Sequence, residues 1–164
     1  MPPGTYLRKR REAAGIRIGE VARQVALMSF GIRPYQTGQI LFELVAAEDD
    51  RTTLSPPQTA LLQHVFPFDR TIYGQLVDLA LADPQTLPHL PQPRICTRCA
   101  CSWNDPCRST IGTSDGSFFI LPCAWTSGPE IDGKEPLCSA CAHAPAPGTI
   151  TIIPTPTNPA KEPA

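Results

Sequence analysis

The sequence predicts a mainly helical N-terminal domain followed by a small cysteine-rich, metal-binding module with short β-strands. Three observations lead to this prediction. Apolar residues at convincing helical spacing fall within residues 5–83. All seven cysteines lie within residues 95–143. Residues 84–94, between these parts, contain four prolines and are typical of a semi-extended linker. The Pro- and Thr-rich tail, residues 144–164, is expected to be disordered.

Five helices are predicted in the N-terminal domain. The first, Tyr6–Ala14, is short and basic, and it ends before Gly15, because glycine favours the position just after a helix. The second spans Gly19–Ala26. Residues 27–38 lack helical periodicity, so a long irregular connection is expected there. The third helix, Gln39–Ala47, carries its apolar residues on one face.

The fourth and fifth helices have the clearest start signals. Ser55 stands before two prolines and three residues before Gln58, which predicts a capping box with proline in the first turn. The apolar stripe of this helix comprises Leu61, Leu62, Val65 and Phe66. Asp69 is expected to cap the fifth helix. That helix should end before Pro84, because proline disfavours helical geometry in the residue before it.

The outer cysteines follow a spacing typical of a metal site. Two Cys-x2-Cys pairs, Cys96/Cys99 and Cys138/Cys141, stand at the two ends of the module. A gap of two residues allows a tight turn to direct both thiolates at one ion. Two such pairs complete a tetrahedral four-cysteine site, which suits Zn²⁺. The sequence therefore predicts one structural zinc ion held by these four residues.

The inner cysteines, Cys101, Cys107 and Cys123, are candidates for binding a second ion. Three thiolates need a fourth ligand to complete a tetrahedral site. His143, two residues after Cys141, is one candidate, and a cysteine shared by two ions is another. The sequence thus predicts one zinc ion and leaves a second ion open.

Metal binding would also explain how so small a module holds together. Its apolar core is expected to comprise only Trp103, Phe118, Phe119, Trp125, Ile131 and Leu137. A core of this size does not stabilise a domain alone, so a structural metal should supply the missing stability. Chelation of the metal is therefore expected to unfold the module.

Three other uses of the cysteines fit the sequence less well. Disulfides would leave one of seven cysteines over, and a reducing compartment opposes them. An iron–sulfur cluster also takes four thiolates, but Cys-x2-Cys-x-Cys does not match the common ferredoxin spacings. A deaminase-type catalytic zinc needs a His-x-Glu motif, and the sequence contains none. We therefore expect a structural site and no enzyme activity.

Charge is distributed unevenly along the chain. The net charge is −1, yet residues 1–33 carry seven Arg or Lys against two acidic residues, and residues 34–93 carry two against seven. This uneven distribution of charge is more informative about binding partners than the total net charge of the chain. No apolar run is long enough to cross a bilayer, and no apolar stretch follows the basic N-terminus as in a secretion signal. We expect a cytoplasmic protein with no membrane partner.

The basic end has a recognisable pattern. Leu7-Arg8, Arg11-Glu12 and Gly15 are followed by the pair Val21-Ala22 in the second helix. This pattern resembles the opening of the Cro/Xre-type helix-turn-helix family, which implies a helix-turn-helix fold and double-stranded DNA as the partner. The implied phosphate contacts are Arg8, Lys9, Arg10, Arg11, Arg17, Arg23 and Arg33. Contacts to base edges would come from Gln36, Thr37 and Gln39.

Two features depart from this family. The expected connection over residues 27–38 is longer than the family's short turn. The third helix also carries Glu43 and is followed by Glu48, and carboxylates are unfavourable near phosphates. The alternative for the basic run Arg8–Arg11 is an ordinary solvated helix face.

A second resemblance covers both parts of the chain. Phe66–Asp69, Cys123–Trp125 and Leu137–Ser139 resemble segments of small proteins encoded by phages and prophages of proteobacteria. The function expected is a DNA-binding transcription regulator in which the zinc module provides a surface for a protein partner or a homodimer. The alternative is a zinc-stabilised protein–protein adaptor with a helix-turn-helix-like fold that does not bind DNA.

Overall fold

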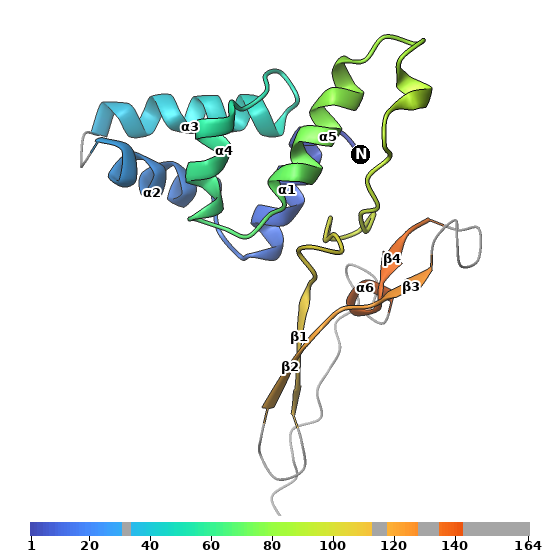
Figure 1. Cartoon of the computed structure of the whole chain (residues 1–164). Helices are drawn as coiled ribbons and strands as arrows, with labels where there is room; N and C mark the ends of the chain where they lie inside the picture. Colours follow the sequence, from blue (N-terminus) through green and yellow to red (C-terminus); the bar gives the residue numbers. More distant parts are fainter. Residues whose placement is uncertain (31–33, 113–117, 128–134, 143–164) are drawn as a thin grey trace, which may run out of the picture.

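The computed structural model describes residues 1–30, 34–112, 118–127 and 135–142. Within these ranges the chain is mainly helical, with two small antiparallel sheets and a cluster of cysteines, as the sequence predicts. Helices α1–α5 gather in one part of the molecule, and strands β1–β4 lie in another together with α6 (Figure 1). No helix of the described ranges is both long enough and apolar enough to span a bilayer.

All five predicted helices are present. They are α1 (Pro3–Ala13), α2 (Ile18–Phe30), α3 (Pro34–Glu48), α4 (Pro56–Gln63) and α5 (Arg70–Leu81). The start signals of the last two are confirmed. The backbone N–H of Ser55 donates to Gln58 Oε1 at 2.8 Å in front of α4. Asp69 Oδ1 accepts the backbone N–H groups of Thr71 and Ile72, which satisfies the first turn of α5.

The connection between α2 and α3 is much shorter than predicted. Because α2 continues to Phe30 and α3 begins at Pro34, the prediction of a long irregular connection over residues 27–38 is wrong. The apolar periodicity of residues 27–38 fails to indicate a helix because Leu27 and Met28 are apolar but exposed. A glycine within α3 also lowers its helix propensity. Proline is accommodated at the start of α3, where its missing N–H has no intrahelical partner.

Glycines set the position of α1 at both of its ends. Gly4 lies so close to α3 that a Cβ in its place would overlap the carbonyl oxygen of Ala47. Its N–H donates to Asp50 Oδ1 at 2.6 Å. Gly15 adopts a φ of 70°, a left-handed conformation that ends the helix as predicted. The basic helix is therefore packed closely against the acidic end of α3.

The helical core extends into the cysteine-rich part of the chain. Its buried members include Tyr6, Leu7, Val21, Leu62, Phe66 and Tyr73, and Ile95 and Ala100 belong to the same cluster. The buried hydroxyl of Tyr6 accepts the backbone N–H of Asp69 at 2.9 Å. Burial raises the pKa of this phenol well above its usual range. The helices and the first segment of the cysteine module thus share one core.

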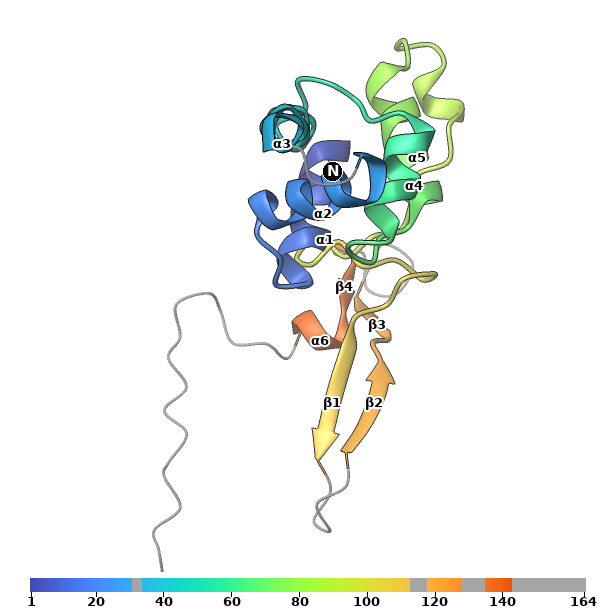
Figure 2. The ribbon, with the colours of Figure 1, turned by 90° about the vertical axis from the view of Figure 1, so that its left-hand side faces the viewer.

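Short strands follow, as predicted. Strand β1 (Arg108–Gly112) pairs antiparallel with β2 (Phe118–Pro122), and β3 (Trp125–Ser127) pairs antiparallel with β4 (Leu137–Cys138), which leads into α6 (Ser139–Ala142). The β1–β2 hairpin extends away from the helices, with β3, β4 and α6 beside its base (Figure 2). The seven cysteines lie before β1, between β2 and β3, and in β4 and α6.

Candidate metal centre

The seven cysteines come together in one cluster. Cys96, Cys101, Cys138 and Cys141 are buried, and Cys99, Cys107 and Cys123 are partly buried and pack against them. Two groups of four have all their sulfur atoms within 4.8 Å of one another: Cys96, Cys99, Cys101 and Cys138, and Cys101, Cys107, Cys123 and Cys138. Each group can hold a metal ion.

A tight turn brings the first pair of cysteines together. The N–H of Cys96 donates to the carbonyl of Cys101, and the N–H of Ala100 donates to the carbonyl of Cys96, both at 2.9 Å. Ala100 has a φ of 60° and no exposed surface. This left-handed conformation is strained for a residue with a Cβ, and it reverses the chain directly after Cys99. The turn thereby positions Cys96, Cys99 and Cys101 around one point.

The second pair is fastened to the same turn. Cys138 ends β4 and Cys141 lies in α6. Thr97 donates its N–H to the carbonyl of Pro136 at 3.0 Å, and Arg98 Nη1 donates to the carbonyl of Cys141 at 2.7 Å. These bonds hold the two cysteine pairs, which stand at opposite ends of the module's sequence, against each other.

Cys107 and Cys123 flank the β1–β2 hairpin. The N–H of Cys123 donates to the carbonyl of Cys107 at 2.8 Å, and the N–H of Cys107 donates to Cys123 Sγ at 3.2 Å. Cys107 Sγ lies 3.1 Å from Cys99 Sγ, and Cys101 Sγ lies 3.6 Å from Cys123 Sγ. The base of the hairpin thus brings the inner cysteines to the outer ones.

Neighbouring thiols of the cluster shift one another's pKa in opposite directions. Hydrogen bonds from the Cys101 thiol first, and also from Cys96, lower the pKa of Cys99 to about 6. Burial, and then the negative charge of Cys99, raise the pKa of Cys138 and keep its thiol protonated. Some thiols therefore stay neutral to stabilise their ionised neighbours. A divalent cation would replace those protons, because metal ligation requires the thiolate.

The structure brings the seven predicted cysteine ligands together, but it groups them differently from the predicted four-cysteine site. All seven cysteines lie in the cluster, but the group around Cys96, Cys99 and Cys138 includes Cys101, and Cys141 belongs to neither group of four. His143 lies outside the described residues. The two groups of four therefore overlap and do not form separate sites.

The predicted core of the module is partly wrong. Trp125 and Leu137 pack against the cysteines as expected, and the guanidinium of Arg94 lies 4.9 Å from the Trp125 ring centre. Trp103, in contrast, is 79% exposed. It follows directly after Ser102, which is itself buried against the helices, so its side chain turns outward. Ile131 lies outside the described residues.

The basic run of α1 makes hydrogen bonds within the chain, although Arg8 is partly exposed. Arg8 donates to Asp49 Oδ1 at 2.7 Å. Arg11 donates to both carboxylate oxygens of Glu48, at 2.6 and 2.8 Å, a geometry that fixes orientation as well as charge. The oppositely charged segments of the sequence therefore neutralise each other at the contact between α1 and α3.

Two further residues of this run contact the cysteine module. Lys9 Nζ donates to the carbonyl of Thr97, and Arg10 Nη2 pairs with Asp105. The Arg10 side chain is only 5% exposed, and that of Asp105 is 18% exposed. α1 therefore connects the helices to the module through charged side chains as well as through the shared apolar core.

The other predicted nucleic-acid contacts are distributed over α2 and α3. Arg17 is exposed, and Arg23 is exposed and paired with Glu20 on the surface of α2. Thr37 is partly buried. Arg33 lies outside the described residues.

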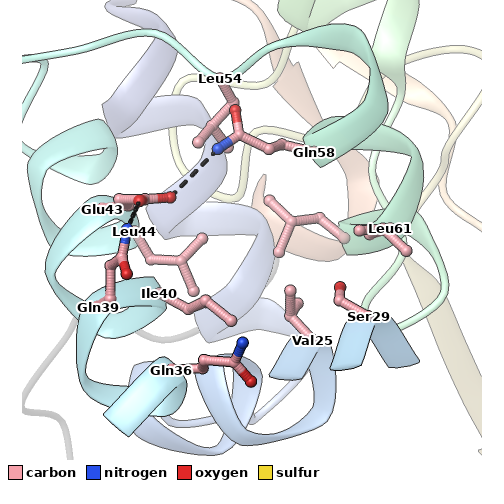
Figure 3. Close-up of a pocket in the computed structure, with 11 residues that line it drawn as sticks. Val25, Ser29, Gln36, Gln39, Ile40, Glu43, Leu44, Leu54, Gln58 and Leu61 are labelled. Atoms are coloured by element: carbon pink, nitrogen blue, oxygen red, sulfur yellow. Dashed lines mark hydrogen bonds between the residues drawn. The ribbon is translucent and has the colours of Figure 1, made fainter. Parts of the chain in front are cut away.

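Gln36 and Gln39 line a cavity of about 270 Å³ between α2, α3 and α4 (Figure 3). Gln39 donates to Glu43 Oε1 at 3.2 Å, and Gln58 of α4 donates to Glu43 Oε2 at 3.3 Å. Val25, Leu44 and Leu61 supply apolar walls. The two glutamines thus belong to a mixed polar and apolar cavity inside the helical layer.

Asp69 and Asp105 lie at the contact between the helices and the cysteine module, a role that no sequence pattern indicates. Besides capping α5, Asp69 Oδ2 accepts from Asn104 Nδ2 at 3.1 Å and from Ser102 Oγ at 3.3 Å. The Asp-Pro dipeptide at 105–106 indicates a turn, but no local signal connects it with α1.

Comparisons with known proteins add no further assignment. No protein family matches the sequence, and searches of curated proteins and of solved structures find no similar protein.

Proposed function

We propose that this chain is a zinc-stabilised protein–protein adaptor whose cysteine cluster is a structural zinc site. Both groups of four ligands consist of cysteine alone. Four thiolates suit Zn²⁺, because structural zinc sites are almost always tetrahedral with four ligands. Neither group contains a carboxylate or an imidazole that would act as a general base, which favours a structural role over a catalytic one.

The internal pairing of the basic run carries this proposal. Arg8, Arg10 and Arg11 each have a carboxylate partner within the chain. Binding of these side chains to phosphate would require breaking those pairs, and Arg10 would also have to leave its buried position. In the proposed adaptor, Arg8 and Arg11 hold α1 against the end of α3, Lys9 and Arg10 hold the cysteine module, and the run does not contact nucleic acid.

Trp103 supplies the surface on which a partner would bind. The turn that carries it is fixed, because Ser102 is buried against Asp69 and Asp105 pairs with Arg10. Tryptophan is enriched among the residues that dominate binding energy at interfaces. An exposed tryptophan on a fixed turn also loses little conformational freedom on binding. We therefore assign Trp103 as the anchor for the protein partner.

Truncation of Trp103 tests the adaptor function. Trp103→Ala should abolish capture of the protein partner from cells by the tagged chain, as measured by quantitative mass spectrometry. Phe42→Ala is the matched control, because Phe42 is 67% exposed on α3. Both variants should unfold at the temperature of the unsubstituted chain. Loss of the partner from both variants, or from neither, would contradict the assignment. Light scattering on the purified chain distinguishes a different partner from a second copy.

The short α2–α3 connection favours DNA binding as a second candidate function. Only residues 31–33 separate these helices, and the exposed Arg17 and Arg23 lie on α2 or directly before it. Fluorescence anisotropy with labelled duplex DNA distinguishes the candidates. Contacts to phosphate should weaken steeply between low and physiological salt and should be lost in Arg17→Ala/Arg23→Ala. The adaptor proposal expects no saturable DNA binding below about 100 µM at physiological salt.

A further inference from the structure

The two groups of four sulfur atoms in the cluster overlap. Cys101 and Cys138 belong to both groups, whereas Cys96 and Cys99 belong only to the first and Cys107 and Cys123 only to the second. A single tetrahedral ion takes four thiolates. One ion would therefore leave three cysteines of a tightly packed cluster without a metal.

The sulfur separations fit a tetrahedral ion on each side of the overlap. With a Zn–S bond of about 2.3 Å, the sulfur atoms of a regular tetrahedron are about 3.8 Å apart. Cys99 Sγ and Cys138 Sγ are 3.7 Å apart in the first group, and Cys101 Sγ and Cys123 Sγ are 3.6 Å apart in the second. These two contacts share no residue. Each side of the cluster thus has one pair of sulfurs at the separation required by an ion, and the shorter contact of 3.1 Å between Cys107 Sγ and Cys99 Sγ joins the two sides.

We infer that the cluster is a two-metal centre in which seven thiolates bind two zinc ions and Cys138 bridges them. Two tetrahedral ions have eight ligand positions, so seven cysteines fill them when one thiolate is shared. Cys96, Cys99 and Cys141 complete the first ion, and Cys101, Cys107 and Cys123 complete the second. This inference rests on the proposed binding of zinc at the cluster.

Cys138 is assigned as the bridge because of its position. It belongs to both four-sulfur groups, and it also starts the Cys-x2-Cys pair that contains Cys141. The bond from Arg98 to the carbonyl of Cys141 holds that residue beside the first cysteine pair. If Cys101 and Cys138 both bridged, the two groups of four would use six cysteines and leave Cys141 without a metal. Sharing Cys138 alone uses all seven.

The metal content of the full chain is the first test. Native mass spectrometry under reducing conditions should find two zinc ions per chain. One ion would overturn the two-metal centre but leave the proposed zinc site intact. No zinc, or iron with sulfide, would overturn both the inference and the proposed site.

The bridge is tested by replacing zinc with NMR-active cadmium. Two cadmium resonances that split each other are expected, because that coupling passes through a shared sulfur. In a proton–cadmium correlation spectrum, the β-protons of Cys138 should connect to both resonances and those of each other cysteine to one. Two resonances without mutual splitting, or a different cysteine connected to both, would overturn the assignment.

Variants at terminal ligands provide matched controls. Cys107→Ser removes a ligand of the second ion only, so it should leave one strongly held cadmium ion with a single unsplit resonance. Cys141→Ser should do the same for the opposite ion. Retention of two coupled resonances in Cys141→Ser would show that Cys141 is not a ligand and would overturn the seven-thiolate arrangement. If either variant fails to fold, the correlation spectrum of the unsubstituted chain still decides the assignment.

Discussion

Arg10 is the most deeply buried charged residue in the part of the chain that the structure describes. It lies on α1, and its partner Asp105 lies on the turn that follows Cys101 in the cysteine module. Moving a charge out of water is unfavourable unless the charge is paired, so each member of the pair depends on the other. The pair therefore requires α1 and the module to keep one relative position.

Replacing Arg10 with methionine should destabilise the protein strongly. The change keeps much of the side-chain volume but removes the buried positive charge that pairs with the Asp105 carboxylate, which should lower the free energy of unfolding by about 3 kcal/mol. Arg17→Met is the control, because Arg17 is exposed and its loss should change the free energy by less than about 0.5 kcal/mol. Urea unfolding followed by circular dichroism measures both. Equal effects of the two substitutions would mean that the buried pair does not stabilise the fold.

At the scale of single elements, α5 depends on one side chain for two purposes. Asp69 accepts the backbone N–H groups of Thr71 and Ile72 at the start of the helix. Its second carboxylate oxygen accepts from Ser102 and Asn104 of the module. The same residue thus begins a helix and fixes the turn that carries Trp103.

Asp69→Ala should therefore destabilise the protein more than loss of an ordinary helix cap. Removal of a cap alone lowers the free energy of unfolding by about 1 kcal/mol. Asp69→Ala also leaves Ser102 and Asn104 without their acceptor, so a loss of about 2 kcal/mol or more is expected. Ser55→Ala at the start of α4 is the matched control, with an expected loss of about 1 kcal/mol. Chemical denaturation measures the free energy of unfolding of both variants. An equal decrease in the two variants would mean that Asp69 acts only as a helix cap.

The sequence predicts these elements where the signal is local. Ser55, Asp69 and Gly15 mark helix ends through hydrogen bonds to residues a few positions away or through their own backbone conformation, so their roles can be predicted without tertiary structure. The boundary between α2 and α3 was not predicted, because exposed apolar residues imitate a break in periodicity. Arg10 and Asp105 are 95 positions apart, and no local pattern shows that they meet.

Local patterns are equally unable to show the long-range contacts within the cysteine cluster. The spacing of the two Cys-x2-Cys pairs predicts that together they bind one ion, because a gap of two residues allows the turn that directs both thiolates of a pair at it. It does not show how close the inner cysteines come to the outer pairs. That proximity depends on Ala100 in its left-handed conformation and on the hydrogen bonds between Cys107 and Cys123. Only the folded chain places Cys138 in both groups of sulfur atoms.

At the scale of the whole molecule, the cysteine cluster and the helices are parts of one folded unit. Ile95 and Ala100, on either side of the first cysteine pair, belong to the apolar core of the helices. Lys9, Arg10 and Asp69 add polar contacts to residues 97–105. Loss of the proposed zinc ion would release the turn that carries these contacts. The stability of the helices should therefore depend on a site to which none of α1–α5 contributes a ligand.

Removal of the proposed zinc ion should consequently lower the stability of the helices as well as that of the module. A metal that binds only the folded chain stabilises it by mass action, and loss of several kcal/mol would lower the unfolding temperature by roughly 10 °C or more for a chain of this length. The measurement is a thermal melt followed by helical circular dichroism, with and without a strong chelator, and excess Zn²⁺ should restore the original transition. Arg10→Met supplies the control for coupling, since weakening the contact with the module should reduce the effect of the chelator on the helices. A helical transition unchanged by chelation would mean that the helices fold independently of the metal centre.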